Sequence, residues 1–311
     1  MKAKWGVRKV TTKREVLCID SGLGSGMGRL AHLHDHIKSL NFHMIATSNT
    51  QWLASYFEHS EPFAAIVVDG NVLNEEESDA LISQVRGSQP DVPLCWLRAS
   101  SPLMKNYRPD LPDKSLELEG TPEEQIKTLN DAIKKRFFPR IVAYAMEFST
   151  RLSIKQSFHL NFEERPSYLR SSHEPLAEVS GMMSFYGHET IGSVVVSGSK
   201  EIMTACREHM LPAAPNSANT QEQDIAGDMC NAIVGRLKGF LEQNGTRVQS
   251  TWPITTTGYP TSLAFGTGRI SLVQDLSSDK GELFVELYLD SFDALTMRRN
   301  LRSRSVNTGE L

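Results

Sequence analysis

Short apolar runs alternate with amphipathic helical patterns over the first part of the chain. Apolar residues that recur every three or four positions predict helices, whereas short, continuous β-branched runs predict buried strands. The expected strands are 15–20, 43–48, 64–70, 92–99 and 115–119, and the expected helices are 27–40, 50–59, 75–88 and 122–136. Strands at this spacing between helices favour a parallel sheet that is covered on both faces. We therefore predict an open, doubly wound α/β unit with five parallel strands.

The pattern changes at Pro139. A helix is expected first, and most of the remaining chain shows the alternation of half-buried strands, interrupted by two more helices. The expected helices are 139–153, 200–211 and 221–243, and the strand-like segments are 157–164, 177–187, 190–199, 247–256, 269–276 and 282–290. This order predicts a second α/β domain with a mostly antiparallel sheet and long helices. The predicted organisation is a flexible N-terminus (1–13), a first domain (14–137), a second domain (138–296) and a disordered basic tail (297–311).

Composition excludes several classes of function. The net charge of −4 over 311 residues does not suggest a nucleic-acid partner. No apolar run approaches the ~20 residues that a membrane span needs, and no signal peptide is visible, so we expect a cytoplasmic protein without a membrane partner. The four scattered cysteines have no C-x-x-C pairing and are expected to be reduced thiols.

The stretch DIAGDMCNAIVG (224–235) carries a polar stripe. Asp224, Asp228 and Asn231 are spaced by four and three residues, which places them on one face of a helix. Ile225, Met229, Ile233, Leu237 and Phe240 fall on the opposite face. The stripe has two interpretations: it is a solvated helix surface, or it is a site.

The first domain resembles the response-regulator receiver fold in the order and lengths of its elements. Asp20 stands where receivers carry acids after the first strand, and Asp69 stands at the position of the phosphoacceptor after the third. Ser21 replaces a second metal-binding acid, Arg98 occupies the hydroxyl position, and no Lys lies among residues 118–120. Phosphoryl transfer needs Mg²⁺ held by carboxylates, and one of these is missing. The resemblance therefore implies a degenerate receiver, a pseudo-receiver in which Mg²⁺ is not expected and Arg98 is expected within salt-bridge reach of Asp69.

The second domain resembles the CheC/CheX chemotaxis phosphatases. The motif of that family is Asp or Ser, three residues, Glu, two residues, Asn, and then a Pro about 22 residues further on. Asp224, Asp228, Asn231 and Pro253 occupy these positions, with Asp228 in place of Glu. Helix 139–153 shows no second copy of the motif, so the single-site CheX pattern fits better than the two-site CheC pattern.

This resemblance implies a phosphatase that acts on the phospho-aspartate of a partner response regulator. In the family, the Asn orients a water in line with the phosphorus and the acid one turn earlier pairs with a Lys of the partner. Catalysis is then mostly positioning and needs neither a metal nor another cofactor from this chain. The alternative is a non-catalytic adaptor that docks a signalling partner through the same domain. A homodimer paired through the sheets is implied by the resemblance alone.

Two further patterns have simpler interpretations. The segment GLGSGMG (22–28) follows a strand but lacks the last Gly of G-x-G-x-x-G and the G-K-[ST] of a P-loop, which favours a plain turn over a phosphate site. His32, His34 and His36 are not completed by an acid or Cys pattern, which favours a solvated helix face over a metal site.

Overall fold

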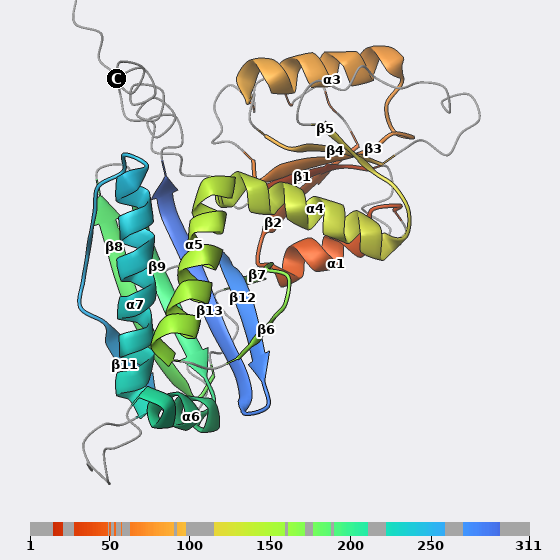
Figure 1. Ribbon diagram of the computed structural model, residues 1–311. Helices are drawn as coiled ribbons and strands as arrows, with labels where there is room; N and C mark the ends of the chain where they lie inside the picture. The colour runs from red at the N-terminus through yellow and green to blue at the C-terminus, as the bar shows by residue number, and fades with distance from the viewer. Residues whose placement is uncertain are drawn as a thin grey trace, which may run out of the picture. The chain divides into compact units, whose positions relative to one another are not determined.

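In a computed structural model of the protein, the described residues are 15–20, 28–48, 50, 53, 57, 63–89, 92–97, 115–158, 161–171, 177–187, 190–210, 222–258 and 270–292. They belong to two compact units that divide between Phe137 and Phe138. Each unit is built on a sheet of its own (Figure 1).

A five-stranded parallel sheet forms the first unit, with the strand order β2-β1-β3-β4-β5. Its elements are β1 (Glu15–Ile19), α1 (Ala31–Ser39), β2 (His43–Thr47), β3 (Ala65–Asp69), α3 (Glu75–Ser88), β4 (Leu94–Leu97), β5 (Ser115–Leu118) and α4 (Pro122–Phe137). Helices α1 and α4 lie together on one face of the sheet, and α3 lies on the other (Figure 1). This is the doubly wound order of flavodoxin-like folds, so the predicted class is confirmed.

Strands β1 and β3 are adjacent in the middle of this sheet. Their apolar residues, 16–19 and 65–68, are at most 1% exposed, as expected for strands covered on both faces. The register pairs Ile19 with Val68, which brings the following residues, Asp20 and Asp69, level with one another at the carboxyl edge. Polar side chains therefore meet where the two apolar runs end.

Helices α3 and α4 both begin with a capping box. The Asn74 side chain accepts a hydrogen bond from the backbone N–H of Glu77, and the Glu77 side chain accepts one in return. At α4, the Thr121 N–H donates to Glu124 Oε2 at 2.7 Å, and the N–H of Glu124 donates to the Thr121 hydroxyl at 3.4 Å. Caps of this kind stabilise a helix by about 1 kcal/mol each.

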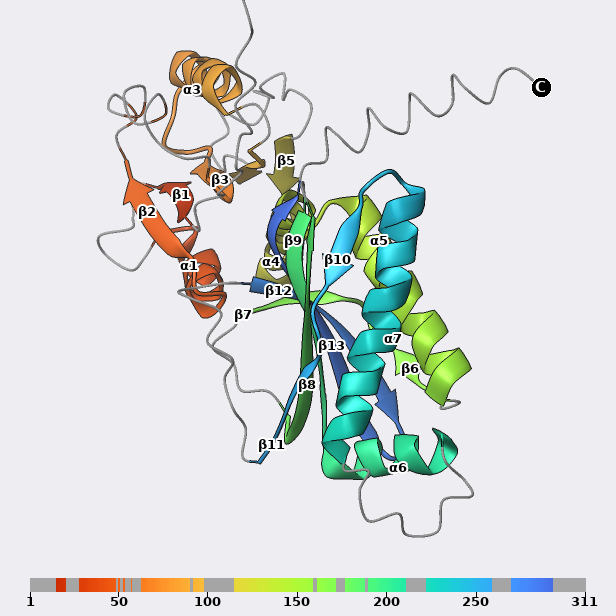
Figure 2. The same ribbon diagram turned by 90° about the vertical axis from the view of Figure 1, so that its left-hand side faces the viewer.

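The second unit contains an eight-stranded antiparallel sheet. Its main path runs β10-β8-β9-β13-β12-β6, with β11 also paired to β8 and β7 also paired to β12. The strands are β6 (Glu163–Glu164), β7 (Tyr168–Ser171), β8 (Val179–Gly187), β9 (Thr190–Gly198), β10 (Val248–Ser250), β11 (Ile254–Thr257), β12 (Ile270–Ser278) and β13 (Gly281–Phe292), and the helices are α5 (Arg140–Ser153), α6 (Lys200–Met210) and α7 (Glu222–Gln243). Figure 2 shows α5 and α7 side by side on one face of this sheet. The predicted mostly antiparallel α/β fold is confirmed.

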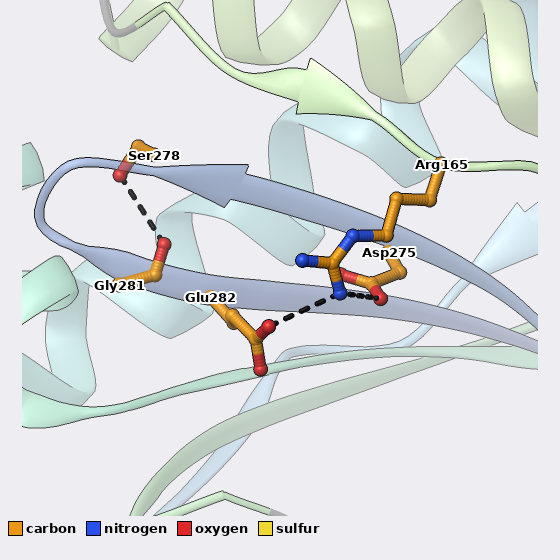
Figure 3. Close-up of polar contacts among 5 residues, drawn as sticks. All are labelled: Arg165, Asp275, Ser278, Gly281 and Glu282. Atoms are coloured by element: carbon orange, nitrogen blue, oxygen red, sulfur yellow. Dashed lines mark hydrogen bonds and ion pairs between the residues drawn. The ribbon is translucent and has the colours of Figure 1, made fainter.

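The hairpin of β12 and β13 is held at its closed end by polar contacts. Arg165 donates to Asp275 at 3.0 Å and to Glu282 at 3.1 Å, and so links the two strands from the chain that follows β6 (Figure 3). The Ser278 hydroxyl donates to the carbonyl of Gly281 at 3.2 Å across the turn. Gly281 has a φ of 135°, a backbone conformation that a residue with a side chain rarely adopts.

Two expectations about the second unit are wrong in detail. Residues 157–164 are not one strand, because a π-helix (Ile154–Phe158) continues α5 and, of the described residues in this segment, only Glu163 and Glu164 pair with β12. Ile154 and Phe158 are buried and spaced by four, so they extend the apolar face of the preceding helix. The segment 247–256 is not a continuous strand either, since it divides into β10 and β11.

Candidate functional site

The polar stripe lies on α7 as the sequence predicts. Asp224, Asp228 and Asn231 are all exposed on this 22-residue helix. Its apolar face contains Ile225, Met229, Ile233 and Leu237, which are each at most 1% exposed. Helical periodicity thus separates a buried face that packs on the sheet from a solvent-facing stripe with two carboxylates and an amide.

Small residues let α7 approach strand β8 closely. A Cβ atom added at Gly181 would lie 2.6 Å from the carbonyl oxygen of Ala226, closer than real Cβ atoms come to such an atom. One turn later, the Cys230 thiol lies 3.9 Å from the carbonyl oxygen of Val194 in β9. The backbone of α7 around Asp224, Asp228 and Asn231 is therefore fixed by direct contact with strands β8 and β9.

Pro253 stands beside the stripe. It lies between β10 and β11, and a Cβ atom added at Gly227 would be 3.7 Å from the Cβ and Cγ atoms of Pro253. Gly227 is the residue before Asp228, and the same added atom would be 3.1 Å from Thr255 Cγ2. The glycine makes room for the chain at Pro253, which explains how residues far apart in sequence meet at this face of α7.

The acidity of one carboxylate of the stripe, Asp228, is shifted. Partial burial raises the pKa of Asp228 above its ordinary value of 3.8, and the negative charge of Asp224 raises it further. A cation bound at this face would lower the pKa of Asp228 and so oppose the effect of the Asp224 charge. Within the described part of the chain, the side chains of Asp228 and Asn231 form no hydrogen bond.

A second cluster of charged residues lies at the carboxyl edge of the parallel sheet. Arg29 Nη1 lies 2.7 Å from Asp69 Oδ1, and the side chain of Asp69 is only 3% exposed. The same Asp69 oxygen accepts a hydrogen bond from the backbone N–H of Asn71 at 3.0 Å. Asp20 is also buried, and its Oδ2 accepts from the N–H of Leu30 at 3.3 Å.

Arg29 was not foreseen as a partner of Asp69. Arg98, the residue expected there, lies outside the described residues, so its salt bridge stays a prediction. The physical expectation that a buried carboxylate takes a cationic partner is met by Arg29, which lies 40 positions away in the sequence. Its only sequence signal is its place at the end of the Gly-rich segment that follows Asp20.

Chains that resemble this protein were found among solved structures. No protein-family model matches the chain, and no curated protein does. A CheC-like superfamily protein from Shewanella sp. PV-4 is similar over 49% of this chain and 99% of its own, with 19% identity and a TM-score of 0.44. The chemotaxis protein CheX from Vibrio vulnificus covers 48% of this chain and 98% of its own, with 20% identity and a TM-score of 0.43.

A third solved structure contains two proteins. It is the CheX–CheY–BeF₃–Mg²⁺ complex from Borrelia burgdorferi, and its matching chain covers 47% of this chain and 96% of its own, with 14% identity and a TM-score of 0.40. With identities this low, the interpretation of the site rests on the residues of this chain.

The histidines of α1 do not form a purely solvated face. His32 Nε2 lies 2.8 Å from Gln125 Oε1, and His36 Nε2 lies 2.7 Å from Asn130 Oδ1. Both contacts join α1 to α4, so the two histidines serve packing between helices. Among the described residues, no group of three or more His, Cys, Asp or Glu is arranged to hold a metal ion.

The remaining sequence expectations concern thiols and membranes. All four cysteines are free and buried, and burial raises the pKa of Cys95, Cys206 and Cys230 to about 12. Such thiols stay protonated and are poor nucleophiles at neutral pH.

No helix in the described ranges is both long and apolar enough to cross a membrane.

Proposed function

We propose that the second unit is a phosphatase that hydrolyses the phospho-aspartate of a partner response regulator. The observation that carries this proposal is the exposure of Asp228 and Asn231 on one fixed face of α7, with Pro253 beside them. These are the positions that the family motif identifies in the sequence. Their spacing of three residues lets both side chains enter the same concave site on a partner.

The proposed reaction needs little chemistry from this protein. The partner's phospho-aspartate is an acyl phosphate, and a water attacks its phosphorus while the bond to the aspartate oxygen breaks. The products are inorganic phosphate and the free carboxylate of the partner. The Asn231 amide holds the water in line, and holding reactants in geometry of this kind is itself a large source of rate enhancement.

Asp228 has a docking role in this scheme. Its carboxylate pairs with a Lys beside the partner's phospho-aspartate, as the acid of the family motif does. Partial burial and, to a lesser extent, the charge of Asp224 raise the pKa of Asp228, and an arriving ammonium group would offset the effect of Asp224. A Lys partner lowers the pKa of Asp228 again.

The first unit is proposed to be a degenerate receiver rather than the substrate. Asp69, at the phosphoacceptor position, is buried and paired with Arg29. Residues 118–120 are Leu, Glu and Gly, so the Lys that Asp228 would bind is absent from this unit. The phosphorylated partner is therefore proposed to be a separate protein, and a cytoplasmic location is part of the proposal.

One observation favours a second candidate function. Asp228 is shorter than the Glu of the family motif by one methylene group, about 1.3–1.5 Å of reach. A misplacement of about 1 Å can reduce a rate by ~10². A chain in which Asp228 falls short of the partner's Lys would retain docking without catalysis and act as an adaptor.

A panel of purified response regulators, each phosphorylated on its acceptor aspartate, tests the proposal. Loss of phosphate is followed with and without the protein, and the Asn231→Ala variant serves as the control. We expect at least one regulator to lose phosphate faster with the wild type and at its intrinsic rate with the variant. Binding of a regulator without faster loss of phosphate would favour the adaptor.

A further inference from the structure

The two most exposed large apolar side chains of the described residues lie two positions apart. Trp252 is 89% exposed and Ile254 is 61% exposed, and they flank Pro253. A tryptophan carries a large apolar surface, and exposed apolar surface of this kind marks interaction sites. Tryptophan is also enriched among the few residues that dominate binding energy at protein interfaces.

The backbone that carries Trp252 is held in place. The N–H of Thr251 donates to the carbonyl of Ser184 in β8 at 2.9 Å, and the Thr251 hydroxyl accepts from the N–H of Ser184 at 3.2 Å. On the other side, Ile254 pairs with Met182 of β8. The backbone of Trp252 is thus held in the short link between β10 and β11, which both pair with β8, and this lowers the entropy lost on binding.

Trp252 precedes Pro253, which lies beside the helix that carries the polar stripe, whereas Ile254 pairs with Met182 and lies on the opposite face of the sheet from α7. Pro253 packs against Gly227, which lies between Asp224 and Asp228 on α7. From Asp224 to Asn231 the helix rises by only about 10 Å. A standard protein interface covers ~800 Å² on each partner, a disc with a radius of roughly 16 Å. A protein that covers the stripe therefore reaches Trp252 as well.

We propose that Trp252 is the apolar anchor that binds the partner response regulator beside its phospho-aspartate. This inference rests on the proposed function, and it assigns the binding strength to a residue outside the family motif. The exposed carboxylates of the stripe contribute orientation and attraction to a Lys, but exposed ion pairs add little affinity. Burial of the Trp252 ring in an apolar recess of the regulator supplies the affinity that the stripe lacks.

The anchor and the stripe have separable kinetic effects. Trp252 does not touch the reacting atoms, so it binds the ground state and the transition state equally. Its loss raises KM and leaves kcat unchanged. Asn231 acts on the attacking water, so its loss lowers kcat. KM and kcat measured with one regulator therefore distinguish the role of Trp252 from that of Asn231.

The experiment uses the full chain and regulators of the panel, loaded with BeF₃⁻ and Mg²⁺ for binding and with phosphate for turnover. Trp252→Ala is compared with Tyr168→Ala, an aromatic residue that is 41% exposed on β7 at the opposite edge of the sheet. We expect Trp252→Ala to weaken binding and raise KM by 10- to 100-fold with kcat unchanged, and Tyr168→Ala to change neither. Circular dichroism checks that both variants keep their fold.

Fluorescence gives a second measurement. The difference between wild-type and Trp252→Ala emission reports on this ring, and we expect it to shift to shorter wavelength when the regulator binds. Equal affinity of Trp252→Ala and wild type for a regulator that the wild type dephosphorylates would overturn the anchor and leave the proposed function intact. Binding that depends on Trp252 without any turnover would support the anchor and overturn the catalytic proposal.

Two other outcomes count against the anchor. If no regulator binds or loses phosphate, both proposals fall. If sedimentation shows that the wild type alone is a dimer and that Trp252→Ala is a monomer, the ring contacts a second copy of the chain and the assignment to a regulator is wrong.

Discussion

The Arg29 guanidinium lies 2.7 Å from the Asp69 carboxylate, and this pair links the turn after β1 to the end of β3. The Asp69 side chain is almost fully buried, whereas that of Arg29 is about one-third exposed. A buried carboxylate without a counter-charge is strongly unfavourable, so Arg29 compensates for the burial of Asp69. A cation of the chain itself thus neutralises Asp69.

Replacing Arg29 should therefore destabilise the first unit. Removal of one partner from a buried ion pair costs about 3–5 kcal/mol, and the partial exposure of Arg29 reduces this to roughly 1–3 kcal/mol for Arg29→Ala. Urea unfolding followed by fluorescence measures the change, with Trp96 buried in β4 of this sheet. The double variant Arg29→Ala with Asp69→Asn should recover part of the loss, because it removes the uncompensated charge. Equal stability of Arg29→Ala and wild type would show that the pair has no stabilising role.

Asp69 should not be phosphorylated by small phosphodonors. The carboxylate is buried and engaged by Arg29 and the N–H of Asn71, and the sequence lacks a second acid after Asp20 and a Lys at 118–120. Mass spectrometry after treatment with acetyl phosphate and Mg²⁺ measures the result, beside an ordinary receiver that is labelled under the same conditions. Stoichiometric phosphate on Asp69 would show that the unit is a working receiver.

Periodicity predicted the stripe on α7 because the signal is local. Asp228 and Asn231 are three residues apart on one helix, so their common face follows from 3.6 residues per turn. The Arg29–Asp69 pair spans 40 positions and the His32–Gln125 contact spans 93, and no local pattern encodes either of them. The expected strand at 157–164 is wrong because alternation over a few residues does not distinguish a strand from an extension of the apolar face of α5.

The close approach of α7 to β8 predicts opposite effects of alanine at two glycines. At Gly181 an added Cβ meets the backbone of Ala226, which cannot move without shifting α7, so Gly181→Ala should destabilise the second unit by about 1–3 kcal/mol. At Gly235, exposed on α7, nothing lies within 4 Å of an added Cβ, and alanine should stabilise by about 0.5–1 kcal/mol. Urea unfolding of the two variants measures both changes. A stabilising Gly181→Ala would contradict the direct contact of α7 with β8.

The raised pKa of Asp228 predicts a pH dependence of stability. A pKa above the ordinary 3.8 means that, between the two values, the folded protein holds a proton that the unfolded chain has released, so stability falls as the pH rises through this interval. Asp228→Asn should therefore melt at a higher temperature than wild type at neutral pH, with no such difference below both pKa values, at about pH 3. When Asp224→Asn is also present, the gain in melting temperature from Asp228→Asn should be smaller but not zero, because burial is the larger cause of the raised pKa of Asp228. A lower melting temperature of Asp228→Asn at neutral pH would contradict the direction of the shift.

Changing the acid of the stripe tests its assigned role in turnover. Asp228→Glu restores the reach of the family's acid by one methylene group, so we expect phosphatase activity toward a responsive regulator to be kept or raised. Asp228→Ala should weaken docking as well as rate, because the pairing with the partner's Lys is lost. Asn231→Ala should abolish stimulated loss of phosphate and leave the fold intact, since an exposed Asn contributes little to stability.

Rates of phosphate release and thermal melts measure these effects on the same preparations. A decrease with Asp228→Glu, in a protein with measurable turnover, would mean that Asp228 does not have the role of the family's Glu. If a regulator binds but neither the wild type nor the Glu variant dephosphorylates it, the second unit is a docking module that has kept the geometry of the stripe without its chemistry.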